Sequence, residues 1–313
     1  MTNTVYEPEG GPAADSVVDA WLAKPPPWRA HDVPPIARAN PPMSAEARRR
    51  GETYIGSGPA EAQCINFALL LRRPLLVTGR PGFGKTTLAY HLAWKLGLGA
   101  PLRWDIGSRS TVGDGLYSYD AVGHLQAAQA GQTVSLADFI TLGPLGTALL
   151  PTARPRVLLV DELDKASFDL PHDLLHVFEE GSFVVPELVR AGGDAKVFPH
   201  DRVGGDDVVP VRNGRVATRH HPVVVITSNR ERELPEAFLR RCVELKLEPP
   251  AEDVVRRIVH LQLGDHVPPE LIDATLKDLP GQATDVVLQT LFLKDRFAVD
   301  VSAAAAVLKR TTP

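Results

Sequence analysis

Cysteine is scarce in this chain. Its 313 residues include two, Cys64 and Cys242, which lie far apart and lack the spacing of a metal site. We therefore expect them to be small buried apolar side chains in a reducing cytoplasm. Positive charge is not in excess either, because the formal net charge is −4 and the pI is near 6.2. This balance argues against strong non-specific binding to nucleic acid.

Long hydrophobic runs are also missing. No apolar stretch approaches the roughly 20 residues that a helix needs to span a bilayer. The first ten residues lack the basic and apolar regions of a secretory signal. We therefore expect a cytoplasmic protein with no membrane partner. The remaining composition, 44% hydrophobic and 23% charged, is typical of a globular chain with room for one large domain and one small one.

Proline, in contrast, is abundant over residues 1–43, which include the run Pro25-Pro26-Pro27. Because proline fixes φ and lacks an N–H, we expect an extended or loosely draped N-terminal extension there. Residues 44–50 read as a capped helix start. Four apolar residues with helical spacing predict one short helix within the extension, which docks on its own chain or on a partner: Val17, Val18, Trp21 and Leu22.

Strand and helix patterns alternate from residue 60 onward. Near-continuous apolar runs of this kind are typical of a parallel sheet that is buried on both faces. With helices between the runs, they predict an α/β fold, a three-layer sandwich around a five-stranded parallel sheet. The predicted strands are Leu75–Thr78, Leu102–Ile106, Val157–Val160, Val223–Thr227 and Val243–Leu247.

The rest of the chain predicts two further units. Residues 249–313 carry no strand signal, and their helical faces indicate a small all-α domain, which leaves 44–248 as the core. One of these faces lies at 303–308. Asn213-Gly214, between two short valine-containing runs, is a strong signal for a β-hairpin with a long loop over 184–218.

One motif carries most of the chemical information. It fits the pattern G-x-x-x-x-G-K-[ST] between a predicted strand and a predicted helix, which is the setting that phosphate binding requires. The glycines let backbone N–H groups surround a polyphosphate, and the helix adds its positive dipole end. Lys85 would reach the β- and γ-phosphates, and the Thr86 hydroxyl would bind Mg²⁺. The motif consists of Gly79, Arg80, Pro81, Gly82, Phe83, Gly84, Lys85, Thr86 and Thr87.

Two acids follow the apolar strand at 157–160. Asp161 and Glu162 should therefore lie at the carboxyl edge of the sheet, beside the phosphate loop. Asp161 would hold Mg²⁺ through water, and Glu162 would accept a proton from the water that attacks the γ-phosphate. The alternative is a helix start, where acids favour the dipole. It explains one acid but not the strand before them.

Further candidates lie downstream. Asn229 ends another apolar strand, where its amide could bridge the attacking water and the γ-phosphate; the alternative is a turn residue. Arg240 and Arg241 end a predicted helix and could be plain surface charge. A guanidinium also suits a transferring phosphoryl group, and another subunit sometimes supplies it.

Taken together, these motifs resemble those of the AAA+ ATPases, and among them the MoxR-like group. Gly79–Thr86 matches the family's Walker A motif, and Val157–Glu162 matches Walker B. Asn229 falls at sensor 1, and the segment 234–241 resembles the one that places the arginine finger at Arg241. A Gly-Pro pair within 139–149 resembles the stretch that follows the helix-2 insert in MoxR proteins.

The resemblance implies a homo-oligomeric ring, often a hexamer, that binds ATP and Mg²⁺ and remodels or assembles a partner protein. Relatives frequently act with von Willebrand factor A domain proteins. Residues 108–136 and 184–218 would be candidates to face the ring's pore. One feature departs from the family, because Pro280–Asp285 contains no sensor 2 arginine.

Three functions stay open at this stage. The leading one is an ATPase that acts as a chaperone or remodeller. The second is a nucleotide-gated interaction or regulatory protein with little hydrolysis, which the missing sensor 2 arginine favours. The third is a nucleic-acid-directed motor, which the acidic balance disfavours.

Overall fold

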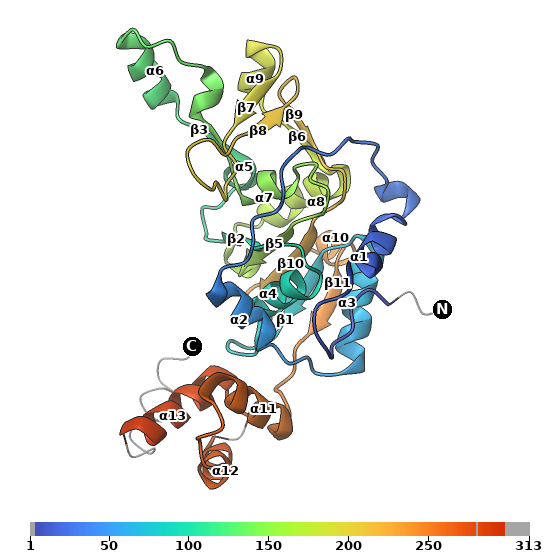
Figure 1. The fold of residues 1–313 in the computed structure, drawn as a ribbon, viewed down its shortest axis with the longest axis vertical. Helices are drawn as coiled ribbons and strands as arrows, with labels where there is room; N and C mark the ends of the chain where they lie inside the picture. Colours follow the sequence, from blue (N-terminus) through green and yellow to red (C-terminus); the bar gives the residue numbers. More distant parts are fainter. Residues whose placement is uncertain (1–3, 280, 298–313) are drawn as a thin grey trace.

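The computed structural model describes residues 4–279 and 281–297. At its centre lies a sheet of five parallel strands in the order β11-β1-β10-β5-β2 (Figure 1). Every strand end lies within one residue of the range that the apolar runs predict, so the predicted α/β fold is confirmed. The strands are β1 (Leu75–Thr78), β2 (Leu102–Asp105), β5 (Val157–Asp161), β10 (Val223–Ser228) and β11 (Val243–Lys246).

Successive residues of the strands contribute to two different cores. Leu75 and Val77 of β1 belong to the core on one face of the sheet, and Leu76 belongs to the core on the other face. Each fully buried leucine or valine stabilises the fold by about 1.5–3 kcal/mol. The first face is covered by α1 (Asp15–Leu22), α3 (Pro59–Leu71) and α4 (Lys85–Lys95), and the second by α5 (Val112–Leu116), α7 (Pro144–Ala148), α8 (Leu170–Glu180) and α10 (Glu236–Leu239).

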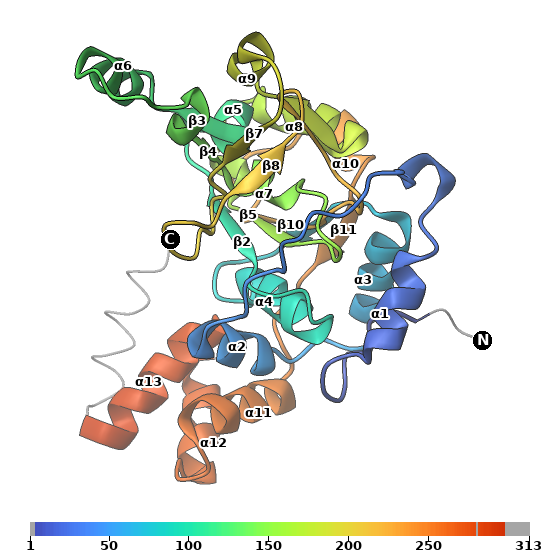
Figure 2. The ribbon, with the colours of Figure 1, turned by 45° about the horizontal axis from the view of Figure 1, so that its top comes forward.

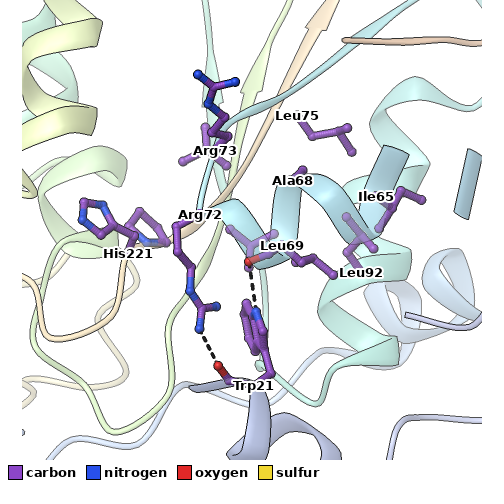
Figure 3. Close-up of a pocket in the computed structure, with 12 residues that line it drawn as sticks. Trp21, Ile65, Ala68, Leu69, Arg72, Arg73, Leu75, Leu92 and His221 are labelled. Carbon is purple, nitrogen blue, oxygen red and sulfur yellow. Dashed lines mark hydrogen bonds between the residues drawn. The ribbon is translucent and has the colours of Figure 1, made fainter. Parts of the chain in front are cut away.

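The N-terminal helix α1 packs on the chain's own core. Trp21 is buried, and its indole Nε1 donates to the Leu69 carbonyl at 3.0 Å. The Arg72 guanidinium lies 3.8 Å from the centroid of the Trp21 ring and donates to the Trp21 carbonyl at 2.8 Å (Figure 3). The small cavity beside these residues, about 10 Å³, is of the size that one water needs. This packing favours a structural role for α1.

The proline-rich segment after α1 is extended but fastened to the core at several points; we call residues 23–43 the strap. It contains one 3₁₀ turn, η1 (Pro27–Arg29). Arg38 pairs with Asp201 and Asp207, both at 3.0 Å, and Asn40 donates to the Leu98 carbonyl at 2.9 Å. After the strap, the predicted capped helix is α2 (Ala45–Glu52), whose first turn donates to Ser44.

An arm projects from the top of the molecule. It is built on an antiparallel pair, β3 (Tyr117–Tyr119) and β4 (Ile140–Leu142). Between them lie α6 (Ala121–Gln129) and η2 (Leu136–Phe139), and Figures 1 and 2 both show α6 at the end of the arm. No residue of α6 is buried. β3 and α6 lie within residues 108–136, one of the two segments that the family resemblance suggests as pore-facing, and β4 follows just after it.

The predicted hairpin around Asn213-Gly214 is confirmed at its turn but not along its strands. Both turn residues have positive φ, and the Arg215 N–H donates to the Arg212 carbonyl at 2.9 Å across one antiparallel bridge, but the flanking strands pair with other partners. A continued hairpin would pair Pro210 with Ala217, and Pro210 has no N–H to donate across that edge. The strands are β6 (Ser182–Val184) with β9 (Arg215–Ala217), and β7 (Ala195–Val197) with β8 (Val209–Val211); the short helix α9 (Pro186–Ala191) follows β6.

The C-terminal helices form a small bundle below the sheet (Figure 1). They have an apolar core of their own, which includes Val259, Ile272 and Leu291. The helical face expected at 303–308 lies outside the described residues. No helix in the described part of the chain has the length and apolar character that crossing a bilayer requires. The helices are α11 (Glu252–Leu263), α12 (Pro269–Asp278) and α13 (Thr284–Phe297).

Candidate functional site

The phosphate loop joins the end of β1 to the start of α4. Gly79, Gly82 and Gly84 all have positive φ, at 149°, 78° and 83°, a region that favours glycine. A Cβ at Gly79 would lie 2.7 Å from the Leu247 carbonyl oxygen, so the loop can approach the end of β11 only because this side chain is absent. The loop thus has the curled backbone that a polyphosphate cradle requires.

Lys85 curls back over the loop and joins it to the next strand. Its ammonium donates to the carbonyls of Gly79 at 2.8 Å and Arg80 at 3.0 Å, and to Asn229 Oδ1 at 2.6 Å. The side chain is buried, and this burial lowers the pKa of Lys85, against the opposing effect of nearby carboxylates led by Asp164. The two residues predicted to contact the γ-phosphate therefore touch each other.

Asp161 lies at the carboxyl end of β5, as the motif predicts. Its Oδ1 accepts from the Thr86 hydroxyl at 3.1 Å and from the Thr227 hydroxyl at 2.7 Å. Its Oδ2 pairs with Arg103 of β2 at 3.1 Å. The predicted Mg²⁺ residues Thr86 and Asp161 thus face each other across the strand ends.

Glu162 follows with a left-handed backbone, φ 62°. Its N–H donates to Thr227 Oγ1 at 2.8 Å, and its carboxylate pairs with Lys165 at 2.6 Å. The side chain is 42% exposed, at the wall of the cavity that contains the phosphate loop. In this arrangement the carboxylate of Glu162 is bound to Lys165.

Three further site residues were not singled out from the sequence motifs. Thr227 bridges Asp161 and the Glu162 backbone, and Arg103 neutralises Asp161. Asp164 is buried, and its Oδ2 accepts from the backbone N–H groups of Asn229 at 2.9 Å and Glu231 at 3.0 Å. These contacts depend on neighbouring strands, so a reading of one strand at a time does not find them. Asp164 does lie within the acidic run after β5.

The cavity has a volume of about 560 Å³, which is within the usual range for small-molecule sites. Its polar wall includes the phosphate loop, Asp161, Glu162 and Asn229. Its lining also includes Tyr54 and Ile55, which precede α3, and Ile258 and Leu288 of the C-terminal bundle. Phosphate-binding groups together with apolar side chains suit a nucleotide.

The two predicted finger residues lie elsewhere. Arg241 pairs with Glu179 at the end of α8 and donates to the Ala237 carbonyl at 3.1 Å. Arg240 pairs with Glu236 at 2.5 Å. Both are exposed, and neither lines the cavity of its own chain.

At the position of the missing sensor 2 arginine, the start of α13 places Thr284 and Asp285 in the cavity wall. Asp285 lies against the phosphate loop, since a Cβ at Gly82 would come within 2.3 Å of its Oδ1. Among the described residues of the bundle, no arginine lines the cavity.

Some solved structures resemble the chain at low sequence identity. NtrX from Brucella abortus, in complex with ADP, is 13% identical with a TM-score of 0.43; the match covers 81% of this chain and 55% of that one. A RuvB point mutant from Thermotoga maritima is 14% identical with a TM-score of 0.45 and coverages of 83% and 72%. PCH-2 from C. elegans is 12% identical with a TM-score of 0.45 and coverages of 86% and 74%.

This chain therefore spans about half the length of the NtrX chain that it matches. Among curated proteins, no sequence matches it. The model of the ATPase family associated with various cellular activities (AAA) matches residues 75–250, which run from β1 to just past β11. With more than half of its length matched in this way, the chain belongs to the AAA family of ATPases, whose members bind ATP or ADP.

Proposed function

We propose that this protein is an Mg²⁺-dependent ATPase that works in a homo-oligomeric ring, most simply a hexamer, and remodels or assembles a partner protein in the manner of MoxR-like ATPases. The observation that carries the proposal is the contact between Lys85 and Asn229 at 2.6 Å, because it brings the Walker A lysine and the sensor 1 amide to one point. A von Willebrand factor A domain protein is the client class that the resemblance suggests.

The metal assignment is supported by the chemistry of the donors. Thr86 and Asp161 offer a hydroxyl and a carboxylate oxygen within 3.1 Å of each other, and Mg²⁺ prefers such hard oxygen ligands. Thr86 would bind the ion directly, and Asp161 would bind it through water. The ion would neutralise charge on the β- and γ-phosphates.

Glu162 is the proposed general base. To reach an attacking water, its carboxylate has to leave Lys165, and its partly exposed position leaves it free to turn. The Asn229 amide would orient the same water, and Lys85 beside it would hold the γ-phosphate. Hydrolysis of the terminal phosphoanhydride then needs one further positive charge.

A neighbouring subunit is the proposed source of that charge. Arg241 is exposed, lies just after α10 and does not line its own cavity, which supports a role in the cavity of an adjacent copy. Such an arrangement makes hydrolysis depend on assembly. Arg240, one residue away, is the other candidate for this finger.

The wall of the cavity also favours a second candidate function. With Asp285 instead of an arginine against Gly82, the described residues of the C-terminal bundle, which we call the lid, offer no positive charge to the γ-phosphate. Weak coupling between lid and nucleotide would leave ATP bound and slowly hydrolysed, as in a nucleotide-gated regulatory protein.

Steady-state phosphate release decides between the two candidates. The Glu162→Gln variant should keep its affinity for ATP while turnover falls by about a hundredfold or more, because removing a general base typically costs 10²–10⁴ in rate. Glu231→Gln, which changes an acid in the same cavity wall but not at the end of β5, is the matched control. Wild-type protein that binds ATP but releases no phosphate, with or without clients, would favour the regulatory function.

The ring is tested by mixing variants. Arg241→Ala subunits keep an intact phosphate loop, and Lys85→Ala subunits keep an intact finger. If fingers act between subunits, the mixture should recover part of the activity that each variant lacks. Co-assembly of tagged subunits provides the control. Co-assembly without recovery would contradict a finger supplied by the neighbour.

A further inference from the structure

One tryptophan is exposed on the strap. Trp28 is 72% exposed, whereas Trp21 and Trp104 are buried and Trp94 is half-buried. An indole can bury 150–250 Å², so leaving it in water forgoes much hydrophobic stabilisation. Tryptophan is also the residue type most enriched among the energetic centres of protein interfaces. The exposed side chain therefore points to a partner surface.

The residues after Trp28 fasten the strap to the core. Arg29 donates to the Phe178 carbonyl at 2.6 Å and to the Glu179 carbonyl at 3.0 Å, both at the end of α8. Cations are favoured at such a helix end. Two residues further on, His31 contacts His221 at 2.7 Å. Because Pro25, Pro26 and Pro27 also fix the backbone before it, Trp28 lies on a pre-ordered surface.

This surface adjoins the proposed arginine finger. Glu179 connects the two, because its carbonyl accepts from Arg29 and its carboxylate pairs with Arg241. Figures 1 and 2 both show the strap beside α8 and α10. A copy of the chain that comes close enough to receive Arg241 would therefore also come close to the strap at Arg29, next to Trp28.

We propose that Trp28 is an interface anchor between copies of this chain, buried against the neighbouring subunit beside the cavity that receives Arg241. The proposal rests on the ring put forward under Proposed function. It adds a specific contact from the N-terminal strap, a segment outside the matched residues 75–250.

A domain that recognises proline-rich peptides is the other kind of partner that a Pro-Pro-Pro-Trp sequence could attract. Such domains bind a free, extended polyproline II segment. Here Pro27–Arg29 form a 3₁₀ turn, and Arg29 is engaged by α8. The structure thus favours a second copy, and the test separates the two partners.

Quenching of tryptophan fluorescence by iodide gives the first test. The Trp28 signal is the difference between the chain and its Trp28→Phe variant, each measured in the Glu162→Gln background that retains ATP. We expect this signal to be quenched in dilute protein and protected in the ATP-bound assembly. An assembly in which it stays accessible would overturn the anchor. Failure of any assembly to form would instead overturn the ring itself.

A truncation of the side chain gives the second test. Trp28→Ala should raise the concentration at half-assembly by about tenfold or more, the loss typical of an interface centre. The melting temperature and ATP affinity of the monomer should not change. Leu125→Ala, which truncates an apolar side chain on α6 that is 59% exposed, is the control and should assemble normally. If Trp28→Ala assembles like this control, or loses only a bound proline-recognising protein, the proposal is wrong.

Discussion

At the scale of single residues, the proposed role of Glu162 as general base depends on whether its carboxylate is free. Its carboxylate forms an i,i+3 pair with Lys165, and both side chains are more than 40% exposed. Such exposed pairs are worth about 0.2–1 kcal/mol. The pair is therefore a weak restraint, which a bound triphosphate could compete with.

Releasing this restraint should raise basal activity. In Lys165→Ala, Glu162 loses the partner that holds its carboxylate, so phosphate release at saturating ATP should increase by up to about fivefold. The comparison is with Lys196→Ala, which removes an exposed lysine from β7. A fall in turnover would mean that Lys165 assists the reaction rather than restraining Glu162.

The sequence predicts most of the residues of the candidate site but not their connections. Lys85, Thr86, Asp161 and Asn229 come together as expected, because each follows the carboxyl end of a parallel strand. The contact between Arg103 and Asp161 could not be predicted from the sequence, because it exists only where β2 pairs with β5.

At the scale of elements, the positions of strands buried on both faces are predictable from the sequence. The pairing partners of the short antiparallel strands are not. A run that is apolar on both faces must be buried on both, so its position in the chain can be predicted from its composition alone. The turn at Asn213-Gly214 was also correctly placed, but a local signal cannot say which strand lies next in space. Phe183 and Val216 are buried where β6 meets β9, and this packing helps to hold that pair together.

The start of α13 gives a prediction at this scale. The Asp285 carboxylate lies against Gly82 and should repel a bound polyphosphate by about 1 kcal/mol at 4 Å in water. Asp285→Asn should therefore bind ATP and ADP about fivefold more tightly, and the difference should shrink at high salt. Titration calorimetry at low and high salt measures the affinities for ATP and ADP. Glu270→Gln on α12 removes a lid charge outside the cavity and should bind as the unchanged chain does.

At the scale of the whole molecule, the N-terminal extension and the core share one apolar interior. Tyr6 is fully buried and contacts His91 of α4, whose Nδ1 donates to the Gly51 carbonyl of α2 at 2.8 Å. Burial lowers the pKa of His91 to about 4 and that of His221 to about 3. Both histidines are therefore neutral in the folded protein.

These histidines make stability depend on pH. Since the unfolded chain takes up protons near pH 6.5 and the folded one does so only near pH 4, stability is complete above 6.5 and declines as the pH falls toward 4. His91 alone should cost about 2 kcal/mol between pH 7 and pH 5. Urea unfolding of His91→Gln should show a smaller loss over this interval.

The close contact between Leu247 and Gly79 connects the phosphate loop to the C-terminal bundle. Leu247 donates its N–H to the Thr78 carbonyl at 2.8 Å, and its own carbonyl fills the space beside Gly79. The chain enters the lid five residues later. The start of the phosphate loop is thus in contact with the segment that acts as a hinge for the C-terminal bundle. We expect a small displacement of this segment, when the γ-phosphate departs, to rotate the bundle as a rigid body.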